Sequence, residues 1–173
     1  MPYSYSLFKN EFKNHLLFNI RSNTAILDVG AGAGTYGKLL KNDFPNIDGI
    51  EIHDPYSKMF DLANYYRNLY IGDVRSFDLM PYDYIIMGDV LEHLSVYEAR
   101  KLLDKIKEQS LLCMVSVPYM FEQGVEYNNQ FEVHLQPDLT HEVFLSRYPE
   151  FNCLWRDKNY GYYVNYEHTD SYQ

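Results

Sequence analysis

The sequence predicts an α/β fold with a mostly parallel sheet, and two observations carry this prediction. Short apolar runs alternate with segments whose apolar residues recur at helical spacing, which is the pattern of strand–helix–strand units. The run at 25–29 also leads directly into a turn made only of glycine and alanine, residues 30–34, before a helix begins. Strand, glycine turn and helix form the opening unit of nucleotide-binding folds, because glycine lets the backbone bend sharply and approach a ligand.

Each further element follows from its own pattern. In residues 5–20, Phe8, Phe12 and Leu16 lie four apart among polar residues, which predicts an amphipathic helix. The other predicted helices follow the glycine turn to about 42–43 and cover 59–66, 99–106 and 140–148. The other predicted strands are 47–52, 69–72, 82–87 and 111–117. The aromatic-rich runs 151–156 and 160–166 predict a closing hairpin, with one antiparallel strand at the edge of the sheet.

The link between the third and fourth predicted strands, residues 73–81, shows no helical pattern. If these strands lie three places apart in the sheet, the sideways step is about 14 Å. About nine extended residues span about 30 Å, so the crossover needs no helix.

Composition limits the classes of protein. A chain of 173 residues suits a single domain, expected over 1–173, with 1–24 supplying the N-terminal helix and 118–137 a substrate loop. The net charge of −9 disfavours nucleic acid as a partner, and no apolar run reaches the length of a membrane span. Cys113 and Cys153 lie in apolar, strand-like runs, which indicates reduced thiols and a cytoplasmic protein. The oligomeric state stays open.

Polar or glycine residues follow four predicted strands at the points where the strands end. The glycine turn ends the first strand, Glu51 the second, Asp73 the third and Asp89 the fourth. In such sheets ligands bind outside the carboxyl ends of the strands, where the strand order reverses. Residues 30–34 carry glycine at alternate positions, whereas the literal dinucleotide fingerprint begins two residues later, past the strand. The spacing therefore disfavours a nicotinamide cofactor.

The chain resembles the class I S-adenosylmethionine-dependent methyltransferases over roughly residues 25–117. The first to fourth motifs of that family resemble the segments ILDVGAGAGTYG, GIEIH, GDVRSF and YDYIIMGDVLEHL. The resemblance implies a Rossmann-like fold, in which helices flank a seven-stranded, mostly parallel sheet with an antiparallel C-terminal hairpin strand. It also implies an enzyme whose cofactor is S-adenosyl-L-methionine.

The resemblance implies a role for each motif. The glycine turn would bring bare backbone against the methionine part and ribose of the cofactor, and Glu51 would accept hydrogen bonds from both ribose hydroxyls. Asp73 would accept from the adenine amino group, and Asp28 would hold the turn, or the cofactor's ammonium through a water. The implied cofactor residues are Asp28, Gly30, Ala31, Gly32, Gly34, Glu51, Ile52, Asp73, Val74, Asp89 and Val90. Each acid alone could instead cap a loop or helix.

Two histidines are candidates for catalysis. A hydroxyl acceptor usually needs a base for its proton, and His93 and His134 are the candidate catalytic residues. With Asp89 and Glu92 they resemble the metal-binding set of some O-methyltransferases, including certain quinone-biosynthesis and small-RNA 2′-O-methylating enzymes, which usually carry Glu at the first position. Asp89-x-x-Glu92 is also the pattern of a capping box for the next helix. We expect no metal.

The loop at 118–137 is the candidate acceptor site. Its aromatic residues Tyr119, Phe121, Tyr127 and Phe131 suit stacking on a ring or a sugar face, or packing of the loop itself. Its element Glu132-Val133-His134 is similar to one in sugar-modifying methyltransferases. We expect O-methylation of a small molecule or sugar, with N-methylation left open. The alternative is a regulatory or interaction protein that binds the cofactor without turnover.

Overall fold

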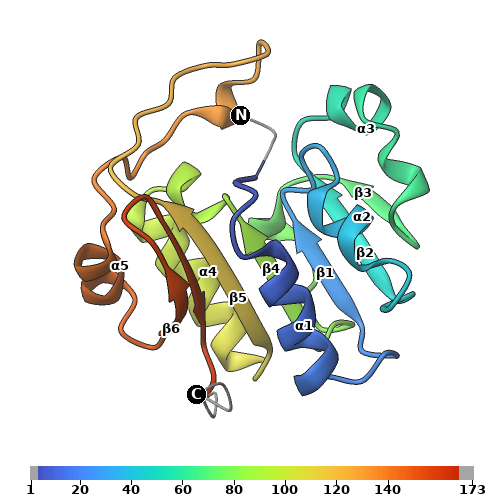
Figure 1. The fold of residues 1–173 in the computed structure, drawn as a ribbon. Helices are drawn as coiled ribbons and strands as arrows, with labels where there is room; N and C mark the ends of the chain where they lie inside the picture. Colours follow the sequence, from blue (N-terminus) through green and yellow to red (C-terminus); the bar gives the residue numbers. More distant parts are fainter. Residues whose placement is uncertain (1–3, 168–173) are drawn as a thin grey trace.

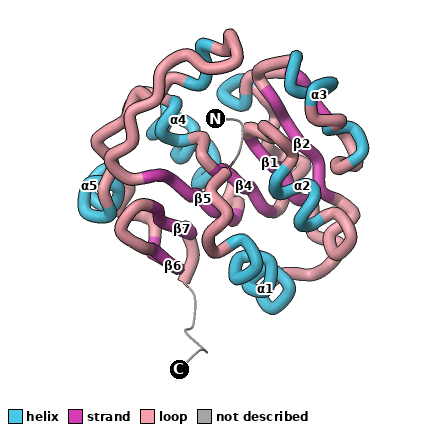
Figure 2. The backbone as a smooth tube through the Cα atoms, turned by 45° about the horizontal axis from the view of Figure 1, so that its top comes forward, coloured by secondary structure: helices cyan, strands magenta, loops and turns pink. Residues whose placement is uncertain are grey.

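The computed structural model describes residues 4–167 of the chain. Seven strands form one sheet in the order β3-β2-β1-β4-β5-β7-β6 (Figures 1 and 2). The strands are β1 (Ile26–Val29), β2 (Ile47–Glu51), β3 (Leu69–Ile71), β4 (Tyr84–Gly88), β5 (Leu112–Pro118), β6 (Asn152–Arg156) and β7 (Tyr160–Val164). The first five are parallel, and β7 runs antiparallel to both of its neighbours. The expected seven-stranded, mostly parallel sheet with an antiparallel hairpin strand is therefore confirmed.

Five α-helices accompany the sheet. They are α1 (Lys9–Asn19), α2 (Thr35–Leu40), α3 (Pro55–Met59), α4 (Val96–Glu108) and α5 (His141–Arg147). Single 3₁₀ turns lie at η1 (Leu62–Asn64), η2 (Val74–Ser76), η3 (Leu91–His93) and η4 (Gln130–Glu132). None of the helices within residues 4–167 is long and apolar enough to cross a membrane.

Two apolar layers hold the helices on opposite faces of the sheet. Alternate residues of β4 divide between them: Ile85 and Met87 pack with α4 and α5, whereas Tyr84 and Ile86 pack with α1 and α2. Because side chains alternate along a strand, a strand buried on both faces has to be apolar throughout, as β4 is. Each fully buried aliphatic side chain contributes about 1.5–3 kcal/mol, so these layers supply most of the driving force for the fold.

The crossover from β3 to β4 places the site. The chain spans three positions of the sheet through residues 72–83, with only the single turn η2 on the way, as the sequence predicts. The strand order reverses between β1 and β4, and their carboxyl ends point toward the loop at 118–137, drawn in orange at the top of Figure 1. Any ligand of this fold class binds at that edge.

Two predicted helices differ from the structure. No continuous helix covers 59–66: α3 ends at Met59, Asp61 adopts a left-handed conformation (φ 51°), and η1 follows. The first helix begins at Lys9 rather than at residue 5, because Phe8 is also left-handed (φ 61°) and packs against the rings of Trp155 and Tyr162. A residue in that conformation interrupts the helical hydrogen-bond pattern.

Candidate functional site

A cavity of about 360 Å³ lies at the carboxyl ends of the parallel strands. Nine of the predicted cofactor residues line it: Gly30, Ala31, Gly32, Glu51, Ile52, Asp73, Val74, Asp89 and Val90. Asp28 and Gly34 are not among the lining residues. Of the two candidate catalytic residues, His93 lines the cavity and His134 lies behind it. The loop at 118–137 contributes the outer wall through Phe131, Val133 and Leu135.

The glycine turn is fixed by the strand beside it. The backbone N–H groups of Gly30 and Ala31 both donate to the carbonyl oxygen of Ile50, at 2.9 and 3.1 Å. Gly30 has a φ of 69°, and a Cβ there would lie 2.7 Å from Cγ2 of Val90. Only glycine satisfies both the left-handed backbone and this close approach, so the turn presents bare main chain to the cavity.

Glu51 is held with both carboxylate oxygens already oriented. Oε2 accepts from the N–H of Gly32 and Oε1 from the N–H of His53, each at 2.8 Å. Burial raises the pKa of Glu51 above its ordinary value, and these two N–H groups oppose the rise. Each oxygen keeps a further lone pair, so the carboxylate can accept two more hydrogen bonds from the cavity.

Asp28 and Gly34 support the turn from behind. Asp28 is buried in β1 and accepts a hydrogen bond of 2.6 Å from the hydroxyl of Tyr66. Burial raises the pKa of Asp28 to about 7. Gly34 is the left-handed residue that begins α2 (φ 76°), and it packs against Leu62 and Tyr65. The structure therefore places both residues where they shape the turn.

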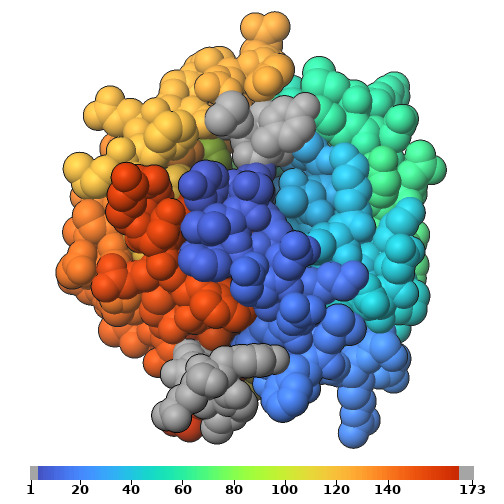
Figure 3. All heavy atoms as spheres, in the orientation of Figure 1, coloured from blue at the N-terminus to red at the C-terminus, as the bar shows by residue number. Residues whose placement is uncertain are grey.

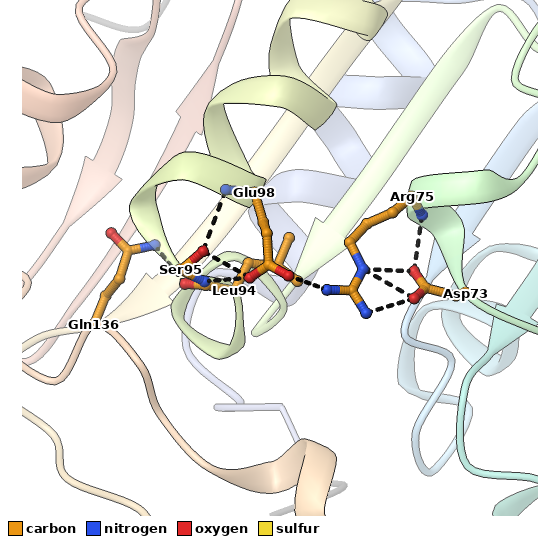
Figure 4. Close-up of polar contacts among 6 residues, drawn as sticks. All are labelled: Asp73, Arg75, Leu94, Ser95, Glu98 and Gln136. Atoms are coloured by element: carbon orange, nitrogen blue, oxygen red, sulfur yellow. Dashed lines mark hydrogen bonds and ion pairs between the residues drawn. The ribbon is translucent and has the colours of Figure 1, made fainter.

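Asp73 is engaged by an arginine that the sequence analysis did not single out (Figure 4). The carboxylate of Asp73 accepts from the backbone N–H and Nε of Arg75 at 2.9 Å and from its Nη2 at 2.5 Å. Arg75 also donates to Glu98 in the first turn of α4, and this guanidinium holds the pKa of Asp73 below its ordinary value. All three side chains line the cavity, so a ligand that uses Asp73 shares it with Arg75.

The alternative interpretation of Asp89-x-x-Glu92, a capping box for the next helix, is not what the structure shows. The box of α4 is Ser95 with Glu98, whose side chains bond each other's backbone N–H groups at 3.0 and 3.3 Å. Asp89 instead precedes the turn η3, Glu92 lies within it, and the two side chains have different surroundings. The signature of the true box, Ser followed three residues later by Glu, is present in the sequence and could have identified it.

Glu92, His93 and His134 form one buried cluster. One ligand atom from each lies within 4.8 Å of the others, and the two imidazole centroids are 4.7 Å apart. Glu92 is 1% exposed, and neither of its carboxylate oxygens has a hydrogen-bond partner among the residues described. Burial raises the pKa of Glu92 well above its ordinary value.

Hydrogen bonds to the main chain fix both imidazoles. Nδ1 of His93 donates to the carbonyl of Val133 at 3.2 Å, and Nδ1 of His134 donates to that of Phe121 at 2.8 Å. Burial lowers both pKa values, that of His93 to about 4. The lowered pKa values favour the neutral form of each ring, in which Nε2 carries a lone pair that bonds no described residue.

Asp89 is separate from this cluster. Its carboxylate accepts from the hydroxyl of Ser4, which precedes α1, and from that of Tyr160 on β7 at 2.8 Å. The residue is left-handed (φ 57°), and burial raises its pKa. Of the four residues that resemble a metal-binding set, Glu92, His93 and His134 thus lie together, whereas Asp89 bonds Ser4 and Tyr160 instead.

The loop at 118–137 is tied to the rest of the site. The Tyr56 hydroxyl of α3 and the Gln123 side-chain amide donate to the Glu132 carboxylate at 2.8 and 2.9 Å. Of the four aromatic residues predicted to stack on an acceptor, Phe131 lines the cavity. The others do not line it: Tyr119 bonds Tyr163, Phe121 contacts His134, and Tyr127 contacts Tyr56, although Phe121 and Tyr127 stay about half exposed.

The fold and the cavity define a class of protein: an α/β protein with a ligand cavity at the carboxyl ends of a parallel sheet. No protein-family model matches the sequence, and no curated protein matches it. Many solved structures are similar, including the following three. The methyltransferase domain of bacterial CtHen1-CN is 16% identical, covering 90% of this chain and 95% of that chain, with a TM-score of 0.66.

The other two contain S-adenosylmethionine. Magnesium protoporphyrin IX methyltransferase (ChlM) from Synechocystis PCC 6803 is 12% identical over 91% of this chain and 78% of that chain, with a TM-score of 0.62. CalS10, an amino pentose methyltransferase from Micromonospora echinaspora, is 12% identical over 91% of this chain and 90% of that chain, with a TM-score of 0.62. The chain thus has the fold of the S-adenosylmethionine-dependent methyltransferases, and the resemblance noted in the sequence is confirmed at the level of the fold.

Proposed function

We propose that this protein is an S-adenosylmethionine-dependent methyltransferase that acts on an oxygen of a small molecule or sugar. One observation carries the proposal: a single cavity at the reversal of strand order joins the glycine turn and Glu51 to the neutral His93. Two proteins of the same fold, ChlM and CalS10, contain S-adenosylmethionine. The glycine turn and Glu51 suit a nucleoside cofactor, and the neutral His93 suits the handling of an acceptor proton.

Each lining residue has a task in this proposal. The glycine turn lies against the methionine part and ribose, Glu51 accepts from the ribose hydroxyls, and Ile52 packs on the adenine. Asp73 and the Val74 amide meet the adenine edge, while Asp89 and Val90 border the amino-acid end. When bound, S-adenosylmethionine supplies a methyl group on a sulfonium that is its own leaving group. The protein therefore has to align the acceptor and exclude water, and the loop at 118–137 is placed to do both.

The proton of a hydroxyl acceptor can go to a neutral imidazole. His93 presents a free Nε2 in the wall of the cavity, and His134 presents another beside it. However, the pKa of His93 is lowered to about 4, so this ring is a weak base at neutral pH. The ring is better suited to donating its lone pair to a cation, since such a role needs the neutral form.

The cluster of Glu92, His93 and His134 fits a divalent metal, although the sequence analysis expects none. The buried carboxylate of Glu92 lacks a partner within the described part of the chain, and both imidazoles are oriented by carbonyls in the way metal ligands usually are. These three side chains would hold the ion. A bound divalent metal would supply a Lewis acid that lowers the pKa of an acceptor hydroxyl.

The test is a methyl-transfer assay with labelled S-adenosylmethionine on a panel of hydroxylated and amine-bearing acceptors, with added Mg²⁺, Mn²⁺ or Zn²⁺ or with chelator. We expect turnover of hydroxyl acceptors that His93→Gln reduces and His141→Gln does not. His141 is the matched control, because it bonds Tyr163 outside the cavity. Stimulation by metal that disappears in Glu92→Gln supports the metal role, and metal-independent turnover removes it.

The alternative is a protein that binds the cofactor without transferring a methyl group. Tight binding of S-adenosylmethionine with no turnover of any acceptor in the panel, with or without metal, favours that alternative. Absence of binding contradicts both functions.

A further inference from the structure

Lys9 is a buried cation whose position nothing in the proposed reaction explains. It is the first residue of α1, only 8% exposed, and makes no salt bridge with the residues described. Its ammonium donates instead to two neutral hydroxyls, to Tyr36 Oη at 2.7 Å and to Ser4 Oγ at 2.5 Å. Burial lowers the pKa of Lys9 to about 8, and the nearby carboxylates of Asp89 and Asp28 oppose this shift. Because the direct partners of the ammonium are neutral hydroxyls, a further negative charge beside them is favourable.

The two hydroxyls are the link between Lys9 and the cavity. Tyr36 and Ser4 both line the cavity, on the side of the glycine turn and Asp89. The Ser4 hydroxyl accepts from Lys9 and donates its one hydrogen bond to Asp89, so it connects Lys9 to that carboxylate. Tyr36 Oη accepts from Lys9, and its nearest other partners, Ser116 Oγ and Tyr162 Oη, are distant at 3.2 and 3.4 Å. Its proton is therefore available to an acceptor inside the cavity, and Lys9 strengthens it as a donor.

Charge is otherwise negative along this wall. Apart from histidine, Arg75 is the only cation among the described residues that line the cavity, and it is paired with Asp73 and Glu98 at the adenine end. The amino-acid end of S-adenosylmethionine carries a carboxylate. A cofactor carboxylate beside the glycine turn lies near the acidic Asp89, and the hydroxyl of Tyr36 is the group that connects it to the positive charge of Lys9.

We propose that Lys9, acting through the hydroxyl of Tyr36, is the positive group that recognises the carboxylate at the amino-acid end of the cofactor. Lys9 is a positioning residue in this arrangement, and residues 4–9 become part of the cofactor site. Figure 3 shows this N-terminal part in dark blue, filling the surface between the C-terminal hairpin in red and the segment after β1 in light blue. The inference rests on the proposed function, because it assumes that S-adenosylmethionine is the cofactor.

The experiment compares ligands that differ only at that end. Calorimetry measures the binding of S-adenosylhomocysteine, of its carboxamide analogue, and of 5′-methylthioadenosine, which lacks the amino-acid end. We expect Lys9→Met to weaken S-adenosylhomocysteine by about tenfold or more and to change 5′-methylthioadenosine by less than about twofold. Tyr36→Phe is expected to show the same pattern at smaller size. Lys13→Met is the matched control on the same helix, since Lys13 pairs with Asp43.

Several outcomes overturn the inference, and one of them also contradicts the proposed function. Equal weakening of both ligands by Lys9→Met indicates that Lys9 only fastens α1 to the sheet. Equal affinity of the wild type for S-adenosylhomocysteine and its carboxamide excludes carboxylate recognition even if the Lys9 variant does not fold. Binding of neither S-adenosylhomocysteine nor 5′-methylthioadenosine by the wild type contradicts the proposed function itself. Binding of both with no selective effect of Lys9→Met contradicts only the present inference.

Discussion

Replacing Glu51 with glutamine tests the cofactor assignment most directly. The wild-type carboxylate is 4% exposed, and its two oxygens accept from the N–H groups of Gly32 and His53 at 2.8 Å. Glutamine keeps the shape and one acceptor oxygen, but its NH₂ group must face one of these N–H donors. The variant therefore loses the charge and one of the two oxygens that would accept a ribose hydroxyl.

The size of the effect follows from the kind of bond that is lost. A hydrogen bond to a charged group contributes about 1.5–3 kcal/mol, which corresponds to a loss of affinity of roughly 10- to 150-fold. Calorimetric titration with S-adenosylhomocysteine measures it, and thermal unfolding checks that the variant is folded. Glu150→Gln is the control, because Glu150 pairs with Arg100 away from the cavity. An affinity of Glu51→Gln within about twofold of the wild type would remove Glu51 from the cofactor site.

Three further variants test other parts of the site. The pKa of Asp28 is about 7 in the folded protein against an ordinary 3.8, so its contribution to the free energy of unfolding is complete below pH 4 and is lost as pH rises through 7. Asp28→Asn should remove this pH dependence, which is worth up to roughly 4 kcal/mol and is measured by urea unfolding at several pH values. An unchanged pH dependence in the variant contradicts the assignment. Gly88→Ala places a Cβ 2.2 Å from the ring of Tyr36, so denaturant unfolding should show a loss of about 1–3 kcal/mol and calorimetry weaker cofactor binding; wild-type values for both would refute this packing. His134→Ala should spare binding of S-adenosylhomocysteine and lower turnover by about 10²-fold or more, and full turnover would make His134 structural.

Local sequence patterns predicted those parts of the protein that depend on local structure. The strands and the glycine turn were predictable, because a buried strand needs an apolar run and the left-handed turn needs glycine. The helix expected at 59–66 is absent because the left-handed Asp61 breaks it. Of the residues that made the helical spacing, Leu62 and Tyr66 are buried, where Leu62 contacts Gly34 and Tyr66 covers Gly37 and Gly49, whereas Met59 and Ala63 are exposed.

The parts of the site that the sequence did not reveal depend on tertiary contacts. Arg75 and Glu98 lie 23 positions apart, and neither belongs to a motif that predicts their pairing. Glu92 and His93 were visible as candidates, but Glu92 becomes buried, with no hydrogen-bond partner for its carboxylate among the described residues, only once the loop that carries His134 folds over it. Burial and pairing are properties of the assembled chain, so sequence patterns could name these residues without assigning their roles.

Asp89 connects parts of the chain that lie far apart in the sequence, so it affects when the cavity forms during folding. Its two carboxylate oxygens accept from Ser4 and Tyr160, residues 156 positions apart, and Tyr160 lies on one of the last strands to be synthesised. This wall of the cavity therefore cannot close until β7 has added to the sheet, however early the glycine turn forms. Ligand affinity consequently reports on completion of the whole fold. During refolding, binding of the cofactor should appear with the slowest phase rather than with the first formation of the β1–β2 unit.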